Sequence, residues 1–352
     1  QMRYVCGRIM KEGVPEWLPF IEAAHGRFSE SVRERLLLIS PPTIDRILRP
    51  YKVTKGRSFT RSTGFRDEIP IQENIWNIEQ PGFMESDTVA HCGGSMHGEF
   101  INTLMMVDIA TTWTEARGVF GRGSNSVFEA LIDIEACLPF PVLGSEAETG
   151  GAPPNRHILS YFHDERAALK RPPVQVTRSR EYKKNDNAHV EQRNDSVARR
   201  YLGYERLGFR ELVPLINYYY ARVVCPLINH FMPTFKLQDK IRIKSRTRRV
   251  YGKPVTPYSR VMASPHVHPA LKARLTNQHR ALNPVQLVAK EQKLRRLIDS
   301  ACRSLAASHP MPQHPEYVLA QQWLSPIQNT VQNFQVSAPL VLHHHVHPHN
   351  LR

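Results

Sequence analysis

The residues Met84-Glu-Ser-Asp87-Thr-Val-Ala-His-Cys-Gly93-Gly94 predict a β-strand that carries an aspartate and ends in a glycine turn. Apolar runs over 82–89, 99–108 and 112–120 are separated by turn residues, as in an antiparallel meander. We therefore expect three consecutive strands that pair in chain order, with Asp87 on the first.

Beyond this meander the sequence alternates between helical and strand-like periods. We expect a helix over 125–137, a short buried strand over 140–144, a helix over 156–168, a strand over 174–177 and a further helix containing Glu191. This order predicts an α/β fold in which a mixed five-stranded sheet is covered by helices.

The stretch Tyr182-Lys-Lys-Asn-Asp-Asn-Ala-His-Val-Glu-Gln-Arg-Asn194 predicts a turn followed by a helix start. An Asn or Asp cap in the turn leaves Glu191 about one turn inside the helix. Arginines at 193, 199 and 200 surround this carboxylate with groups suited to phosphate. The alternative is a solvated helix face, because Glu near Arg is common surface patterning.

Together these segments resemble the DDE transposase and retroviral integrase superfamily, with the closest likeness to bacterial insertion-sequence transposases that have an integrase-type catalytic core. The matching residues cover roughly 15 to 290 and follow the family's order. They are Ser40-Pro-Pro-Thr-Ile-Asp-Arg-Ile-Leu48, Asp87-Thr-Val-Ala-His-Cys-Gly93, Trp113-Thr-Glu115, Leu138-Pro-Phe-Pro141, the Glu191 stretch and Lys253-Pro-Val-Thr-Pro-Tyr258. The resemblance implies a ribonuclease H-like core that carries out transposition, DNA recombination and DNA integration.

The resemblance also implies three metal-binding carboxylates: an Asp on the first strand, an Asp after the fourth strand and a Glu on a following helix. Asp87, Glu148 and Glu191 stand at these positions and are the predicted catalytic and metal-ligating residues. Two divalent ions, Mg²⁺ or Mn²⁺, would support strand cleavage and strand transfer in such a site.

The second carboxylate departs from the family pattern. Glu148 replaces the expected Asp, within Ser145-Glu-Ala-Glu-Thr-Gly-Gly-Ala-Pro-Pro-Asn155, and its extra methylene displaces the carboxylate. Two hypotheses follow: an active DDE-type polynucleotidyl transferase, or a catalytically inactive transposase remnant that only binds DNA. Asp108 on the second strand is a possible substitute ligand, although we expect a structural role for it.

The positive charge of the chain is concentrated in one block. The net charge is +15, and residues 166–260 hold 22 Lys and Arg against seven Asp and Glu. Such a block favours double-stranded DNA as the partner, because cations that neutralise phosphates release counterions. An anionic membrane surface is the rival partner, but the block contains no strongly amphipathic basic helix.

The helical pattern near the start suggests a DNA-reading element. We expect helices over 15–24 and 30–38 and a third that starts at Ser40-Pro41 and stops before Pro50. The last two suit a helix-turn-helix that presents Thr43, Asp45, Arg46 and Arg49 to DNA. We accordingly predict a DNA-binding region over 1–50, a basic linker over 51–80, a catalytic core over 81–206, a basic C-terminal region over 207–308 and a disordered His/Pro/Gln-rich tail over 309–352.

A second basic element follows in the C-terminal region. The alternation in Lys240-Ile-Arg-Ile-Lys-Ser-Arg-Thr-Arg-Arg249 predicts one strand with Lys240, Arg242, Lys244, Arg246 and Arg248 on one face. Together with Lys183 and Lys184, these cations are the predicted contacts to the DNA backbone. A solvated edge strand is the alternative for 240–249.

Cysteine usage and hydropathy indicate the compartment. The five cysteines are far apart, without a Cys-x-x-Cys pair, which favours reduced thiols over zinc or disulfides. No apolar run approaches the roughly 18 residues of a membrane span. We expect a cytoplasmic, nucleoid-associated protein that works as a homo-oligomer on transposon-end and target DNA and has no membrane partner.

Overall fold

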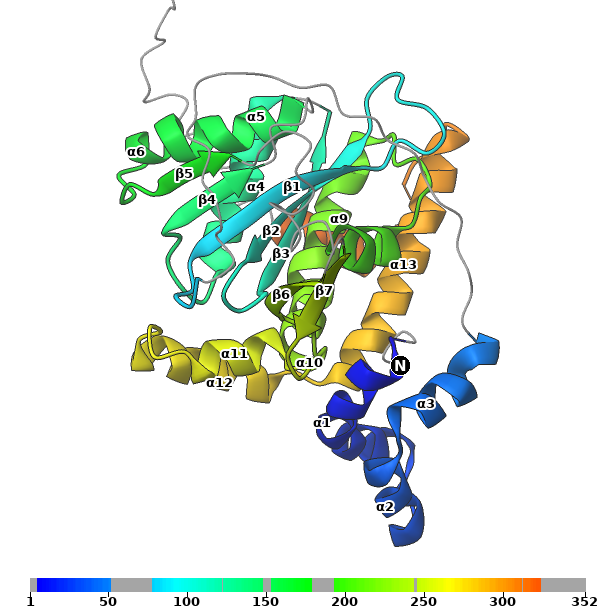
Figure 1. The fold of residues 1–352 in the computed structure, drawn as a ribbon. Helices are drawn as coiled ribbons and strands as arrows, with labels where there is room; N and C mark the ends of the chain where they lie inside the picture. Colours follow the sequence, from blue (N-terminus) through cyan, green and yellow to red (C-terminus); the bar gives the residue numbers. More distant parts are fainter. Residues whose placement is uncertain are drawn as a thin grey trace, which may run out of the picture.

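A five-stranded mixed sheet forms the centre of the protein (Figure 1), whose structure is a computed structural model that describes residues 5–51, 78–121, 123–147, 153–178, 193–243, 246–311 and 313–323. The strand order is β3-β2-β1-β4-β5. Strands β1, β2 and β3 pair antiparallel, whereas β4 runs parallel to β1 and β5 parallel to β4. The strands are β1 (Phe83–Ala90), β2 (Ile101–Asp108), β3 (Thr114–Phe120), β4 (Gly144–Ala147) and β5 (Gln175–Arg178). This arrangement is a ribonuclease H-like fold and confirms the predicted fold class.

The fourth strand starts later than the sequence pattern predicts. The expected strand over 140–144 is an irregular segment, and β4 begins only at Gly144. Pro139 and Pro141 have no N–H to donate to a strand ladder, so the hydrogen-bonded strand forms beyond them. Phe140 and Val142 are nevertheless buried in the core. The apolar run therefore identified burial correctly and strand pairing incorrectly.

Helices α4 (Ser124–Cys137) and α5 (Pro153–Ser160) cover one face of the sheet. The α5 chain continues through the π-helical turn η3 (Tyr161–Glu165) into α6 (Arg166–Ala168), so the helix predicted over 156–168 is present. Leu104 and Met106 of β2 pack with Leu131 and Ile134 of α4 in this layer. Alternate residues of β2 thus face this side, as expected for a strand buried on both faces.

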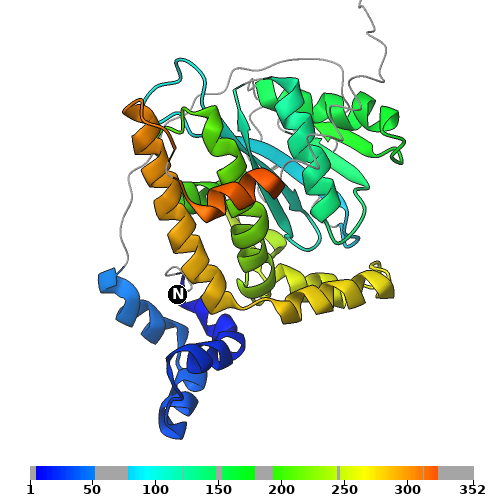
Figure 2. The same cartoon turned by 180° about the vertical axis from the view of Figure 1, so that it is seen from behind.

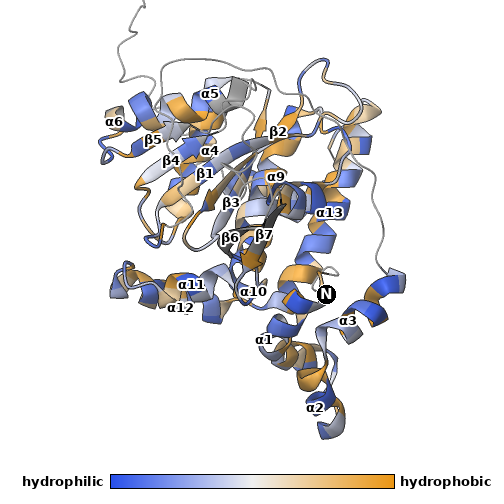
Figure 3. Cartoon of the chain, in the orientation of Figure 1, coloured by the Kyte–Doolittle hydropathy of each residue, from blue (hydrophilic) through white to orange (hydrophobic). Residues whose placement is uncertain are grey.

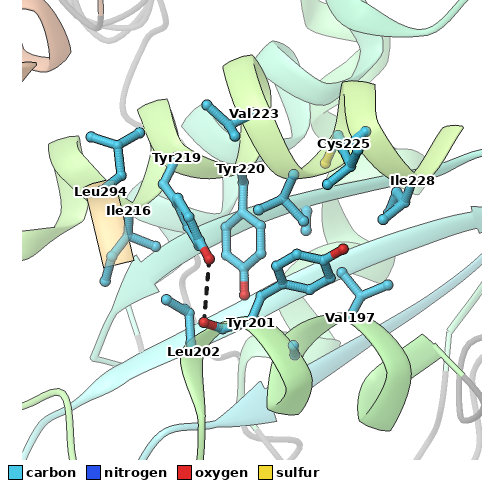
Figure 4. Packing of buried hydrophobic residues seen from close by; sticks show 14 of the residues in the cluster. Val197, Tyr201, Leu202, Ile216, Tyr219, Tyr220, Val223, Cys225, Ile228 and Leu294 are labelled. Carbon is cyan, nitrogen blue, oxygen red and sulfur yellow. Dashed lines mark hydrogen bonds between the residues drawn. The ribbon is translucent and has the colours of Figure 1, made fainter. Parts of the chain in front are cut away.

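The other face is covered by a helical run from Val213 to Phe231. This run consists of α9 (Val213–Tyr219), the π-helical η6 (Tyr220–Val224) and α10 (Cys225–Phe231). Figure 4 shows Tyr219 and Tyr220 of the run pointing toward Tyr201 and Leu202, which belong to the same buried cluster. The region beyond residue 207 therefore shares one hydrophobic core with the sheet.

Two asparagines of this helical run bond the outer edge of the sheet. Asn229 accepts a hydrogen bond from the Thr114 N–H (2.9 Å) and donates to the Thr114 carbonyl (2.8 Å). Asn217 accepts from the Gly118 N–H at 2.6 Å. Strand β3 is an edge strand, and these side chains satisfy backbone groups that would otherwise template pairing with another chain.

The long helix α13 (Pro284–Ala306) lies against this run. Its buried residues Leu287, Leu294, Ile298 and Ala301 recur at helical spacing and join the core of the helical run. Figure 3 shows hydrophilic residues on the side of α13 that faces away from the sheet. A second contact is polar: the Tyr219 hydroxyl donates to Glu291 at 2.5 Å.

The N-terminal helices are α1 (Gly7–His25), α2 (Glu30–Leu38) and α3 (Pro41–Leu48). The bounds of α2 and α3 match the prediction, but the helix expected over 15–24 begins at Gly7 and contains Pro15 and Pro19. Tertiary packing outweighs the prolines here: the buried Trp17 side chain donates to the Phe231 carbonyl at 2.8 Å.

Residues predicted as one basic strand form a two-stranded ribbon instead. Strand β6 (Leu237–Ile243) pairs antiparallel with β7 (Arg246–Tyr251). In this register Lys240 pairs with Arg249, whereas Ile241 pairs with Arg248 and Ile243 with Arg246. Arg246 and Arg248 thus occupy the register positions of the isoleucines, so the prediction of five cations on one face of one strand is wrong. The chain therefore reverses between Ile243 and Arg246, which alternation alone cannot show.

Two further helices follow the ribbon, α11 (Pro257–Ala263) and α12 (Pro269–Ala281). The tail predicted as disordered over 309–352 contains a helix over 315–323, which lies across the back of the α9–α10 run in Figure 2. Ala320 is fully buried, and the ring of Trp323 lies 5.8 Å from the Arg117 guanidinium carbon. The prediction of disorder is wrong for this helix, because its apolar contacts with the core hold it in place. Residues 324–352 lie outside the described part.

Candidate active site

Asp87 lies in the middle of β1, the central strand of the sheet. Its side chain is buried, and its Cα partner on β2 is Met105. On the other side, β4 runs parallel to β1 and its last residue, Ala147, is the partner of Ser86. Glu148 lies outside the described residues, but it follows Ala147 directly, as Asp87 follows Ser86. The assignment of Glu148 as the second carboxylate therefore stays a prediction.

Asn194, which lies far along the sequence, is a hydrogen-bond partner of the Asp87 carboxylate. The Asn194 amide Nδ2 donates to Asp87 Oδ2 at 2.6 Å, and the Thr88 N–H donates to Asp87 Oδ1 at 2.7 Å. Asn194 is the first residue of the π-helical η4 (Asn194–Arg199). The contact joins residues 107 positions apart.

Glu191 lies outside the described residues, three positions before Asn194. Its role as the third metal ligand stays a prediction.

Two further carboxylates share the sheet face of Asp87. Glu85 is two residues before Asp87 on β1, and Glu146 of β4 is the Cα partner of Glu85. Side chains alternate along a strand and partners point to the same side, so Glu85, Asp87 and Glu146 lie on one face. Glu85 is 2% and Glu146 3% exposed. Sequence reasoning missed both, although the two-residue spacing of Glu85 from Asp87 and of Glu146 from Glu148 is the signal that identifies them.

These described carboxylates do not by themselves form a metal site. In the described ranges, no group of three Asp, Glu, His or Cys residues is arranged to hold a metal ion. The residues that are present still suit a hard divalent cation, because the donors are oxygens. The Asn194 Oδ1 beside Asp87 is buried and accepts no hydrogen bond from the described part of the chain. An oxygen left in this state fits an additional ligand near Asp87.

Asp108 has a structural role, as expected. It is fully buried and accepts hydrogen bonds from the Gly82 N–H (2.7 Å), the Thr111 N–H (2.7 Å) and the Thr111 hydroxyl (2.6 Å). The two bonds from Thr111 close the turn between β2 and β3, in which Thr112 has a φ of 61°, and the bond from Gly82 ties this turn to the residue before β1. Burial raises the pKa of Asp108 to about 6, although the hydrogen bonds oppose the shift.

His91, near the end of the sequence that carries Asp87, is also structural. Its Nε2 lies 2.8 Å from the Thr103 hydroxyl, which lies 3.0 Å from the Tyr220 hydroxyl. Burial lowers the pKa of His91 to about 3, so the imidazole is neutral at physiological pH. The chain of polar groups joins β1, β2 and η6 inside the core.

Of the predicted DNA contacts near the N-terminus, two are exposed and two are bonded within the protein. Arg46 and Arg49 are exposed on and just beyond α3, one helical turn apart. Thr43 instead bonds its cap residue: its N–H donates to the Ser40 hydroxyl. Asp45 accepts from the Gly7 N–H at 3.0 Å and so ties α3 to the start of α1. The prediction that Asp45 is presented to DNA is therefore wrong.

The remaining predicted contacts are less defined. Lys183, Lys184 and Lys244 lie outside the described residues. Lys240, Arg242, Arg246 and Arg248 are placed only by the backbone of the β6–β7 ribbon, as described above.

The strand order and the aspartate on its central strand define an α/β protein with a ribonuclease H-like sheet. No protein-family model matches the chain. The chain is 36% identical over 263 residues to the uncharacterized protein y4rM of Sinorhizobium fredii (strain NBRC 101917 / NGR234), and the match covers 73% of this chain and 73% of that protein. The chain therefore belongs to the family of y4rM.

A solved structure is more distantly similar. It is the cryoEM structure of a simian T-cell lymphotropic virus intasome in complex with PP2A regulatory subunit B56 gamma. The sequence identity is 13% and the TM-score 0.30, with coverage of 67% of this chain and 87% of that chain. A likeness of this size carries no functional weight, and the strand order and contacts given above support the fold on their own. No helix in the described ranges is long and apolar enough to cross a membrane.

Proposed function

We propose that the protein is a DDE-type polynucleotidyl transferase, a transposase or integrase that cuts DNA and joins strands. One observation carries the proposal: Asn194 contacts Asp87 at 2.6 Å, while β4 ends at Ala147, the Cα partner of Ser86. Three segments far apart in the sequence thereby converge on one aspartate. In the sequence, β1 carries Asp87, β4 directly precedes Glu148, and η4 follows Glu191.

In this proposal Asp87, Glu148 and Glu191 hold Mg²⁺ or Mn²⁺. Two such ions, when bound, activate the attacking hydroxyl and stabilise the leaving oxygen of a phosphodiester. The Asn194 amide orients the Asp87 carboxylate through its hydrogen bond. The rigid centre of the sheet fixes Asp87, since both neighbouring strands pair with β1.

The partner in this proposal is double-stranded DNA, both transposon ends and target. The basic block over 166–260 supplies affinity for phosphates that is independent of sequence. Strand transfer between two DNA ends is most simply performed by a homo-oligomer on DNA, and nucleoid association would follow from DNA binding.

The test is nicking of supercoiled plasmid by the full chain with Mn²⁺. We expect nicking that is lost in Asp87→Asn and retained in Asp164→Asn. Asp164 is the matched control, because its side chain is 65% exposed on the π-helical turn η3. Equal nicking by the wild type and Asp87→Asn would contradict the proposal.

A second candidate function is DNA binding without catalysis. It is favoured by Glu148, which is longer than the Asp implied by the family resemblance, and by the Asp87 oxygens, which both already accept hydrogen bonds. Tight DNA binding without nicking in either metal would support this function. Replacing 145–155 with an Asp-Asn-Gly element should then restore cleavage.

A further inference from the structure

A cavity of about 310 Å³ lies on the Asp87 side of the sheet, at the end where β2 turns into β3. Its walls come from the start of α1, from Val107 and Thr112, from the η4 helix and from the segment after α10. Polar and aromatic lining residues are Thr112, Arg193, Ser196, Arg200, Tyr201, Thr234 and Phe235. The exposed Cys6 and Arg200 place its opening at the surface. This volume is at the lower end of the range for small-molecule sites, about the size of one nucleotide.

The charge around the cavity is positive. Arg193 lines it, is 8% exposed, and donates one hydrogen bond to the Thr112 carbonyl at 3.0 Å. None of the cavity-lining residues in the described ranges is acidic. A buried guanidinium has five N–H donors, so Arg193 keeps donors for a ligand after its bond to Thr112.

The guanidinium of Arg260 contacts two of the residues that line the cavity. Arg260 donates to the hydroxyls of Thr112 (2.8 Å) and Thr234 (2.7 Å), both of which line the cavity. Burial and the charge of Arg260 lower the pKa of Arg193 to about 10, and burial lowers the pKa of Arg260 to about 10. In the described part of the chain neither arginine forms an ion pair with a carboxylate. Two desolvated cations held together in this way favour an anion between or beside them.

The cavity is adjacent to the proposed active site. Val107 in its wall is two residues along β2 from Met105, the Cα partner of Asp87, which corresponds to about 7 Å. Arg193 is also the residue before Asn194, which contacts Asp87. About 7 Å corresponds to the axial rise of about two stacked nucleotides, at 3.4 Å per base along one strand.

We propose that this cavity binds one nucleotide at the end of a DNA strand, with its phosphate on Arg193 and its base beside Tyr201 and Phe235. The proposal rests on the proposed function for the DNA source of the nucleotide. Arg200 contributes charge at the opening, and Ser196 and Thr234 add polar surface to the lining. Aromatic surfaces stack any base without sequence preference, which suits a site for a strand end.

Cys6 gives a readout that does not depend on cleavage. Its thiol lines the cavity and is exposed, so alkylation by iodoacetamide, measured on the Cys6 peptide by mass spectrometry, reports occupancy. With thymidine monophosphate at ten times its Kd, we expect the alkylation rate to fall about tenfold. Thymidine without phosphate should give no protection at the same concentration.

Two variants and a matched control locate the effect. Arg193→Gln removes the buried cation and should weaken nucleotide protection by about 10- to 100-fold. Ser196→Leu fills the cavity without removing any charge, and should abolish protection even if Arg193→Gln fails to fold. Arg199→Gln is the control, because Arg199 lies on the same helix, stacks on Tyr204 at 5.2 Å and does not line the cavity. In Arg199→Gln, thymidine monophosphate should protect Cys6 from alkylation as strongly as it does in the wild type.

The outcomes separate this proposal from the proposed function. If inorganic phosphate alone protects Cys6 as strongly as thymidine monophosphate does, the nucleotide site is overturned. It is also overturned if thymidine monophosphate still protects Cys6 fully in Ser196→Leu. If a duplex with a one-nucleotide overhang protects Cys6 no better than a blunt duplex, the DNA-end assignment is overturned. Nicking activity tests the proposed function independently, because the Cys6 protection is measured with EDTA and without cleavage.

Discussion

The centre of β1 and the turn end of β2 each bury an aspartate, yet the two regions use it differently. Asp108 accepts two hydrogen bonds from Thr111 in the turn that follows it and one from Gly82, the residue before β1. Asp87 accepts one bond from the next residue and one from Asn194, far along the chain. Burial alone therefore does not assign a role to either carboxylate. What distinguishes Asp87 is its bond to Asn194, 107 positions along the chain and next to the predicted Glu191 segment.

The largest effect is expected at Asp87. Asp87→Asn keeps the size of the side chain but removes the charge needed by a divalent ion, so DNA nicking should fall by at least about 10³-fold, or about 4 kcal/mol in activation free energy. The melting temperature should change little. Plasmid nicking and thermal unfolding, measured on the same preparations, check the two parts. A large loss of stability with proportionate loss of nicking would give Asp87 the structural role of Asp108.

At Asp108 we expect the opposite result, in which stability falls and nicking is retained. Asp108→Asn places an amide N–H₂ toward donors from Gly82 and Thr111, and should lower the free energy of unfolding by about 2 kcal/mol. Nicking per folded molecule should stay at the wild-type level. Urea unfolding followed by circular dichroism measures the stability. If nicking is lost while stability is unchanged, Asp108 is a ligand after all.

The pH dependence of stability sharpens the same comparison. The pKa of Asp108 is raised by burial to about 6 in the folded protein, from an ordinary value of 3.8. Between pH 4 and pH 6 the folded state thus binds a proton that the unfolded state has lost, and this group makes the free energy of unfolding decrease as pH rises.

Asp108→Asn should remove at most about 1.4 kcal/mol per pH unit of this slope. Urea midpoints at several pH values in this window measure it. Glu16, whose pKa burial raises to about 7, contributes in the same direction and is unchanged in both proteins. Parallel curves for the wild type and Asp108→Asn would contradict a raised pKa at Asp108.

Much of the sheet could be predicted from alternation and turn residues, whereas the site could be predicted only in part. The three meander strands and the helices over 30–38 and 124–137 follow from local periodicity, and the structure has them. The contact of Asn194 with Asp87 depends on how η4 crosses the sheet, which no local pattern contains. Glu85 and Glu146 share a face with Asp87 because of the register between β1 and β4.

Local signals failed where tertiary contacts override them. The helix start at Gly7 needs α3 beside it: a Cβ on residue 7 would lie 2.1 Å from the Pro41 carbonyl oxygen. Glycine thus permits the close approach of the two helices, and Asp45 bonds its N–H. The antiparallel pairing of β6 with β7 and the helix over 315–323 likewise depend on contacts that no local pattern contains.

A smaller effect is expected from the partner of Asp87. Asn194→Ala removes the amide that orients the carboxylate, and should reduce nicking by about tenfold. A positioning role also predicts that more Mn²⁺ is needed for half-maximal nicking, which a general loss of stability would not produce. Asn217→Ala is the control for loss of a buried amide, because Asn217 bonds the edge strand β3 and not Asp87.

The smallest effect is expected at the N-terminal helices, away from both aspartates. Replacing Arg46 and Arg49 with Gln should flatten the log-log dependence of duplex DNA affinity on salt by up to about two units. The matched control replaces Arg296 and Arg303, two exposed arginines on α13, with Gln. Fluorescence anisotropy across salt concentrations measures the slopes. Equal slopes for the two double variants would remove α3 from the DNA interface.

Binding of Mn²⁺ to the full chain, measured by electron paramagnetic resonance, tests the central comparison most directly. We predict that the wild type and Asp108→Asn bind Mn²⁺ alike, because the Asp108 oxygens are committed to the β2–β3 turn. Asp87→Asn should lose most of this binding while remaining folded. Equal Mn²⁺ binding by Asp87→Asn and the wild type, or loss of binding in a folded Asp108→Asn, would contradict the account.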